Sequence, residues 1–114
     1  MNVSELSGRI LCMGAINMDL VMFMETLPTP GQTLVTDNFS TFPGGKGGNQ
    51  AVTAAVLGGD VSYFGKLAND GFSAELLAGM SARGVDIRNV LRDPDSTAGI
   101  AMIWVDARGQ NSIV

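Results

Sequence analysis

The sequence predicts an α/β fold that carries a small, separate β-sheet. Short apolar segments typical of strands alternate with two helix-like segments, a pattern that indicates a parallel sheet covered by helices. Two further pairs of strand-like segments, each joined by a turn, belong to neither helix and are expected to form the separate sheet. The length of 114 residues is that of one domain.

The first half of the chain predicts one buried strand followed by a hairpin. The apolar run from Arg9 to Ile16 ends at polar residues and suits a buried strand. Leu20 to Glu25 and Thr33 to Phe39 are strand-like and flank a turn at residues 28–31, PTPG. We therefore expect these two segments to pair as antiparallel strands.

The middle of the chain predicts a helix, a strand and a second helix. Residues 49–57 are rich in alanine and leucine, and the glycine pair that follows them is a typical helix stop. Val61 to Leu67 is the next predicted strand. Ser73 to Ala82 is the second predicted helix and ends before Gly84.

The end of the chain predicts another hairpin. Ile100 to Val105 and Ser112 to Val114 flank the turn Asp106 to Gly109. The apolar ending also suggests that the sequence is a fragment of a larger protein, since natural chain ends are usually polar and exposed.

The composition excludes several classes of partner. A net charge of −4 without a basic cluster argues against nucleic acid and anionic membranes. The single cysteine, Cys12, cannot form an internal disulfide and is compatible with a reducing cytosol. The apolar stretch of residues 10–24 is interrupted by two polar residues and has no basic region before it, so neither a signal peptide nor a membrane span is expected. A cytoplasmic protein is the expectation.

A glycine-rich loop precedes the first predicted helix, with the sequence FPGGKGGNQAV at residues 42–52. It fails the phosphate-binding pattern, because Lys46 is followed by Gly47 and no hydroxyl residue comes next. It fails the dinucleotide pattern because Gln50 stands where a glycine is required. The loop still leads into a helix N-terminus, which favours anions or hydroxyl oxygens. A tight turn with its lysine in solvent is the alternative.

A second polar group closes the first predicted strand. Asn17 and Asp19 are two residues apart, so they lie on one face of an extended chain. Ligands of open α/β sheets bind beyond the carboxyl ends of the strands. A carboxylate there accepts hydrogen bonds from neighbouring hydroxyl groups and repels an anion, so the pair suits a polyol. The alternative is that the two residues only end the strand.

Together these segments resemble the phosphofructokinase-B type carbohydrate kinases. The resemblance covers essentially the whole chain and includes an N-x-D pattern followed by GGKGGNQA, a fairly specific combination. One departure is Ala68, where many relatives have a glycine. The matching segments, in family order, are GAINMD at 14–19, LPTPGQT at 27–33, FPGGKGGNQAV at 42–52 and STAGIAMIWVD at 96–106.

The resemblance implies a ribokinase-like, three-layer Rossmann-type sheet with a small β-lid. Residues 1–114 would be the N-terminal part of the kinase domain, and the nucleotide-binding C-terminal part would be absent from the chain. The lid would be discontinuous, formed by residues of about 17–42 and 97–114.

The resemblance also assigns residues to a sugar site. Five residues would hold the sugar hydroxyls: Asn17, Asp19, Gly45, Lys46 and Asn49. Gly47 and Gly48 would let the backbone approach the sugar, and we expect Ile103 to face it as part of an apolar floor. No metal ligand is expected here. The family's catalytic aspartate lies in a G-A-G-D motif further along the chain, so no residue of this chain is assigned as the base.

The implied activity is transfer of phosphate from ATP to the primary hydroxyl of a pentose, with ribose, giving ribose 5-phosphate, as the first choice. ATP, Mg²⁺ and, as a further option, a monovalent cation would bind beyond Val114, so the chain alone would be inactive. A homodimer through the lid is expected. Deoxyribose, ketohexose and nucleoside kinases stay open as alternatives, as does a non-enzymatic sugar-binding half-domain.

Overall fold

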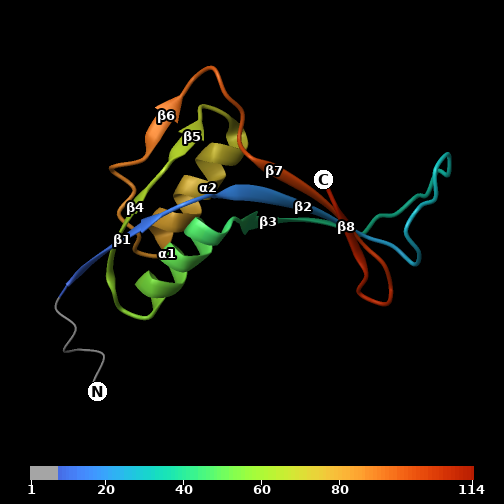
Figure 1. Ribbon diagram of the computed structural model, residues 1–114, viewed down its shortest axis with the longest axis horizontal. Helices are drawn as coiled ribbons and strands as arrows, with labels where there is room; N and C mark the ends of the chain where they lie inside the picture. Colours follow the sequence, from blue (N-terminus) through green and yellow to red (C-terminus); the bar gives the residue numbers. More distant parts are fainter. Residues whose placement is uncertain (1–7) are drawn as a thin grey trace.

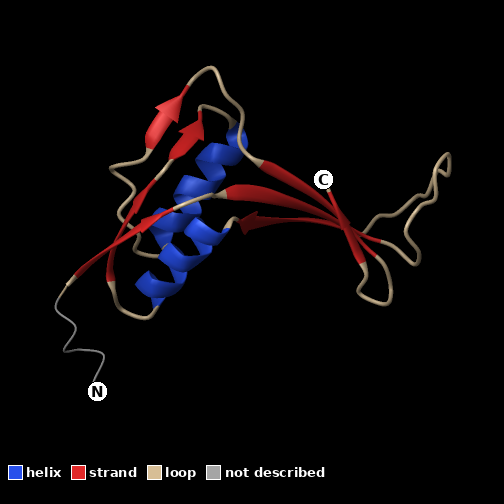
Figure 2. Ribbon diagram, viewed as in Figure 1, coloured by secondary structure: helices blue, strands red, loops and turns tan. Residues whose placement is uncertain are grey.

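The computed structural model describes residues 8–114 and has an elongated shape, with extents of 55 × 40 × 19 Å. A helical layer lies at one end, and a twisted sheet extends away from it (Figures 1 and 2). In chain order the elements are β1 (Arg9–Met13), β2 (Asn17–Phe23), β3 (Phe39–Gly44), α1 (Lys46–Val56), β4 (Asp60–Phe64), β5 (Lys66–Ala68), α2 (Gly71–Ala82), β6 (Leu91–Asp93), β7 (Ile100–Val105) and β8 (Asn111–Ile113).

The central layer is parallel, as the alternation of strands and helices predicts. β1 pairs with β4, and β5 pairs with β6, both in parallel. Between these pairs, the amide of Tyr63 donates to the carbonyl of Asp86, and the amide of Asp86 donates to the carbonyl of Val61. The segment that follows α2 therefore runs beside β4 and continues into β6. The predicted strand 61–67 is present but is divided at Gly65 into β4 and β5.

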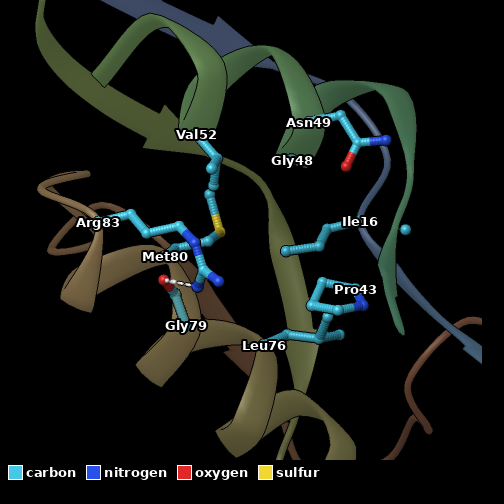
Figure 3. Close-up of a pocket in the computed structure, with 10 residues that line it drawn as sticks. Ile16, Pro43, Gly48, Asn49, Val52, Leu76, Gly79, Met80 and Arg83 are labelled. Atoms are coloured by element: carbon cyan, nitrogen blue, oxygen red, sulfur yellow. Dashed lines mark hydrogen bonds between the residues drawn. The ribbon is translucent and has the colours of Figure 1, made fainter. Parts of the chain in front are cut away.

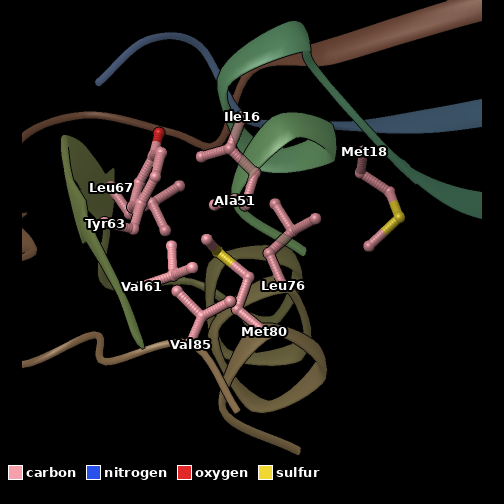
Figure 4. Close-up of a cluster of buried hydrophobic side chains, with 9 residues drawn as sticks. All are labelled: Ile16, Met18, Ala51, Val61, Tyr63, Leu67, Leu76, Met80 and Val85. Carbon is pink, nitrogen blue, oxygen red and sulfur yellow. The ribbon is translucent and has the colours of Figure 1, made fainter. Parts of the chain in front are cut away.

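The core lies between one face of this layer and the two helices (Figure 4). Its residues come from the strands, from both helices and from the connections between them, and they are Ile16, Met18, Ala51, Val61, Tyr63, Leu67, Leu76, Met80 and Val85. The opposite face of the layer is different. Leu11 and Met13 are 60% and 65% exposed and Phe64 is 39% exposed, although both faces of a parallel sheet are usually covered.

The remaining strands form one separate four-stranded sheet, as expected from the sequence, in the order β3-β2-β7-β8. β2 is antiparallel to β3 and parallel to β7, and β7 forms the predicted hairpin with β8. The expected antiparallel hairpin is present, with Met22 opposite Phe39. Its second strand lies later than predicted, because β3 spans Phe39–Gly44 and residues 24–38 are almost entirely irregular.

The position of β3 explains this error. Pro43 and the glycines beside it read as a loop, yet Pro43 pairs with Met18 across the sheet. Proline is tolerated there because β3 is an edge strand, where a missing N–H breaks no ladder. The helices also begin earlier than predicted, α1 at Lys46 and α2 at Gly71. In the part of the chain that the structure describes, no helix has the length and apolar character needed to cross a membrane.

Asp70 joins the helical layer to the separate sheet. One of its carboxylate oxygens accepts from the amide of Ser73 at 2.8 Å and caps α2, and the other accepts from the amide of Ala98 at 2.7 Å. Ala98 is two residues before β7. The hydrogen bonds from Ala98 and Ser73 hold the pKa of Asp70 below its ordinary value of 3.8.

We predict that Asp70→Asn lowers the free energy of unfolding at neutral pH, because an amide places a donor where one of the two accepting oxygens was. A carboxyl group with a lowered pKa contributes stability above its unfolded pKa and loses it as the pH falls through the folded value. The difference between the wild type and the variant should therefore be constant at neutral pH and shrink below pH 3.8. Urea denaturation across pH 2.5 to 7 measures it, with Asp37→Asn, an exposed carboxylate, as the control. A difference that does not change with pH would contradict this assignment.

Candidate functional site

The candidate site lies where the start of α1 meets the connection between β1 and β2. At this junction the backbones are too close for side chains. A Cβ atom added to Gly45 would lie 2.5 Å from the carbonyl oxygen of Ala15, and one added to Gly47 would lie 2.7 Å from the Cα atom of Gly14. Gly45 also has a φ of +91°, which disfavours any other residue. The glycines are therefore needed for the helix to reach the connection.

Hydrogen bonds fix the same junction. The amides of Gly47 and Gly48 donate to the carbonyl oxygen of Ala15 at 3.0 and 3.2 Å. These amides belong to the first turn of α1, where a phosphate-binding helix offers its free N–H groups. Because they are already engaged, this helix start is not a phosphate cradle, in agreement with the failed sequence patterns. The structure places Gly47 and Gly48 in the interior, buried against Gly14 and Ile16.

Asn17 and Asp19 form a hydrogen-bonded pair at the start of β2. The side-chain amide of Asn17 donates to Oδ1 of Asp19 at 2.5 Å, and both residues are half-buried. Gly44 lies opposite Asn17 on β3, and a Cβ atom there would lie 2.5 Å from both carboxylate oxygens of Asp19. The amide therefore orients the carboxylate, and the glycine leaves it space. Because the Asn17 amide binds Oδ1, the second carboxylate oxygen, Oδ2, is the one that can accept a hydrogen bond from a ligand.

Lys46 and Asn49 lie in the first turn of α1, and both are exposed. Lys46 forms no ion pair with a carboxylate within residues 8–114, so no neighbouring carboxylate there holds its ammonium group. The predicted polar residues come from two elements, β2 and the start of α1, whose backbones meet at the junction. β2 contributes acceptors, and the start of α1 contributes donors.

Ile103 lies on the same face of the separate sheet as Asp19. In the parallel pairing of β2 with β7, Val21 is opposite Ile103 and Met22 is opposite Trp104. Since side chains alternate along a strand, Ile103 shares its face with Val21 and Asp19, and Trp104 lies on the other face. The apolar side chain predicted for the site is thus further along the same surface.

A separate hollow of about 210 Å³ lies between α1 and α2 (Figure 3). Its wall is mainly apolar, and Arg83, which also lines it, donates to the carbonyl of Gly79 at 3.0 Å. Of the predicted site residues, Gly48 and Asn49 line this hollow, whereas the Asn17–Asp19 pair and Lys46 do not. An apolar hollow does not match a polyol, so the junction is the better candidate.

Gly44 lies against the Asp19 carboxylate and also lines the hollow, a position that the sequence did not predict. Its signal was present as the first glycine of the GGKGG segment, but its role depends on the pairing of β3 with β2, which was not predicted. Within residues 8–114 no group of three or more histidine, cysteine, aspartate or glutamate side chains is arranged to hold a metal ion.

Comparison with known proteins gives the same family as the motifs. Residues 7–114 match the pfkB family of carbohydrate kinases. Ribokinase of Schizosaccharomyces pombe is 40% identical over 111 residues, which cover 92% of this chain and 35% of the relative. A deoxyribokinase of Salmonella typhi is 33% identical over 105 residues, which cover 92% of this chain and 34% of the relative.

Solved structures show the same fold. The structure of Arabidopsis thaliana ribokinase complexed with ribose and ATP superposes with a TM-score of 0.82 and 29% identity, covering 93% of this chain and 34% of that one. The chain spans about a third of the length of the two relatives from Schizosaccharomyces pombe and Salmonella typhi. It has the N-terminal portion of the ribokinase-like fold, and it belongs to the pfkB family of carbohydrate kinases.

Proposed function

We propose that this chain is the sugar-binding side of an ATP-dependent kinase that phosphorylates the primary hydroxyl of a pentose, with ribose, giving ribose 5-phosphate, as the first choice. The observation that carries the proposal is the Asn17–Asp19 pair, held against Gly44 at the junction with α1. It occurs in a chain of the pfkB family whose relatives include enzymes named ribokinase and deoxyribokinase.

In this proposal the residues divide the recognition of the sugar among them. The Asp19 carboxylate accepts hydrogen bonds from neighbouring hydroxyl groups, and Asn17 keeps the carboxylate in one orientation. Lys46 and Asn49 donate from the start of α1. Gly45 keeps the helix start close to the strand connection, and Gly47 and Gly48 pack against that connection at Gly14 and Ile16. Ile103 offers an apolar surface on the same face as Asp19.

The rest of the chemistry falls to another part of the kinase domain. The first amides of α1 are engaged with Ala15, and residues 8–114 hold no cluster of metal ligands. ATP, Mg²⁺, any monovalent cation and the general base would therefore be bound or supplied outside this chain. The exposed apolar face of the central layer, at Leu11, Met13 and Phe64, supports the view that further structure covers it in the intact enzyme.

We assign the separate sheet as a lid over the sugar, formed by residues of about 17–42 and 97–114. Excluding water protects ATP from hydrolysis, and lids commonly provide this protection. One face of the lid carries Asp19. The other face carries apolar side chains, among them Phe39, Ile100 and Met102, which are 53%, 45% and 45% exposed. Such a surface favours association, so we propose that two lids meet in a cytoplasmic homodimer.

The intact protein is predicted to phosphorylate ribose faster than other sugars. ADP release measured across a panel of ribose, deoxyribose, fructose and adenosine tests this, and the position of the new phosphate is read by NMR. Turnover of fructose or adenosine without turnover of any pentose would contradict the pentose assignment. Sugar binding without any turnover would favour the alternative of a sugar-binding half-domain.

Asp19→Ala is predicted to weaken ribose binding more than Lys46→Ala. A hydrogen bond to a charged group contributes about 1.5–3 kcal/mol, and Asp19 can form two such bonds whereas Lys46 is expected to form one. Calorimetric titration of ribose measures both losses, and Glu75→Ala, which removes an exposed carboxylate from α2, is the matched control. Equal losses, or a larger loss for Lys46→Ala, would show that the carboxylate does not have this role.

A further inference from the structure

Tyr63 connects the buried core to the candidate site. It is the only tyrosine of the chain, it lies on β4, and it is 0% exposed. Its hydroxyl donates to the carbonyl oxygen of Gly14 at 2.5 Å. In Figure 4 the hydroxyl oxygen is directed away from the centre of the apolar cluster. The ring therefore packs in the core, and its one polar atom reaches the connection between β1 and β2.

The carbonyl that Tyr63 holds is next to the junction. The following carbonyl, that of Ala15, accepts from the amides of Gly47 and Gly48. Gly14 itself lies against Gly47, where an added Cβ atom would come within 2.7 Å of its Cα atom. Asn17 follows three residues later and orients Asp19. The Tyr63 hydroxyl thus binds the connection that leads into β2, with Asn17 and Asp19, and that also binds the start of α1.

The surroundings of the ring indicate that the hydroxyl serves to bind the Gly14 carbonyl. A phenylalanine would fill nearly the same apolar volume, so the oxygen adds a hydrogen bond rather than packing. A Cβ atom at Gly65 would lie 2.7 Å from the hydroxyl oxygen, so the glycine leaves room for it. Burial raises the pKa of Tyr63, which keeps the phenol protonated and able to donate at neutral pH.

We propose that Tyr63 is a positioning residue for the sugar site. By holding the Gly14 carbonyl it fixes the connection between β1 and β2, and through that connection the Asn17–Asp19 pair and the start of α1. The effect on sugar binding rests on the function proposed above, whereas the effect on the backbone does not.

Tyr63→Phe tests the proposal with two independent measurements. Amide hydrogen exchange at Gly47 and Gly48 should become roughly three- to tenfold faster, the factor expected for one lost hydrogen bond, while exchange in α2 is unchanged. Ribose affinity should fall by a similar factor. In the intact enzyme KM for the sugar should rise while KM for ATP stays the same, a division that a general loss of stability would not produce.

Ser73→Ala is the control for removing a buried hydroxyl without losing a hydrogen bond, since the Ser73 hydroxyl on α2 is equally buried but has no partner among the described residues. It should change neither the exchange at Gly47 and Gly48 nor the ribose affinity. Unchanged exchange and affinity in Tyr63→Phe would overturn the proposal, as would exchange that accelerates equally throughout the chain. If the wild type binds no sugar, the proposed function fails, and the exchange at Gly47 and Gly48 alone decides whether Tyr63 positions the connection.

Discussion

The close approach of α1 to the connection between β1 and β2 is the constraint on which the rest of the structure depends. No side chain fits at Gly45 or Gly47, and the Ala15 carbonyl binds two amides of the helix. The backbone distance is therefore fixed by direct contact. Because β2 begins at this connection, the same contact determines where Asn17 and Asp19 lie relative to Lys46 and Asn49. The arrangement of the candidate site therefore follows from the packing of α1 against the connection between β1 and β2.

β2 serves both the core and the site because its side chains alternate. Met18 is fully buried in the core cluster, while Asn17 and Asp19 are only half-buried and lie on the other face. A register shift by one residue would exchange these environments, placing a carboxylate among apolar side chains. The pairing of β2 with both β3 and β7 resists such a shift. Asp70 adds a second link between the layers, from the start of α2 to Ala98 before β7.

The sequence predicted what depends on local periodicity and on motifs. The two helices and the hairpin at the chain end were correct because apolar spacing and glycine stops mark them. The first strand is present as β1, but most of its residues are exposed and not buried as expected. β3 was placed too early in the chain because Pro43 and Gly44 are loop residues by composition, and only the edge position of the strand makes them acceptable. The role of Gly44 beside Asp19 depends on that pairing. The bond from Tyr63 to Gly14 joins residues 49 positions apart, and no local pattern encodes it.

We expect a sugar to bind at the junction of β2 and α1 and not in the hollow between the helices. Titrating ribose into the ¹⁵N-labelled chain and recording amide chemical shifts tests it most directly. We expect the largest changes at Asn17, Asp19, Gly45 and Lys46, none of which lines the hollow. Changes confined to Val52, Leu76 and Arg83, which line the hollow, would contradict it.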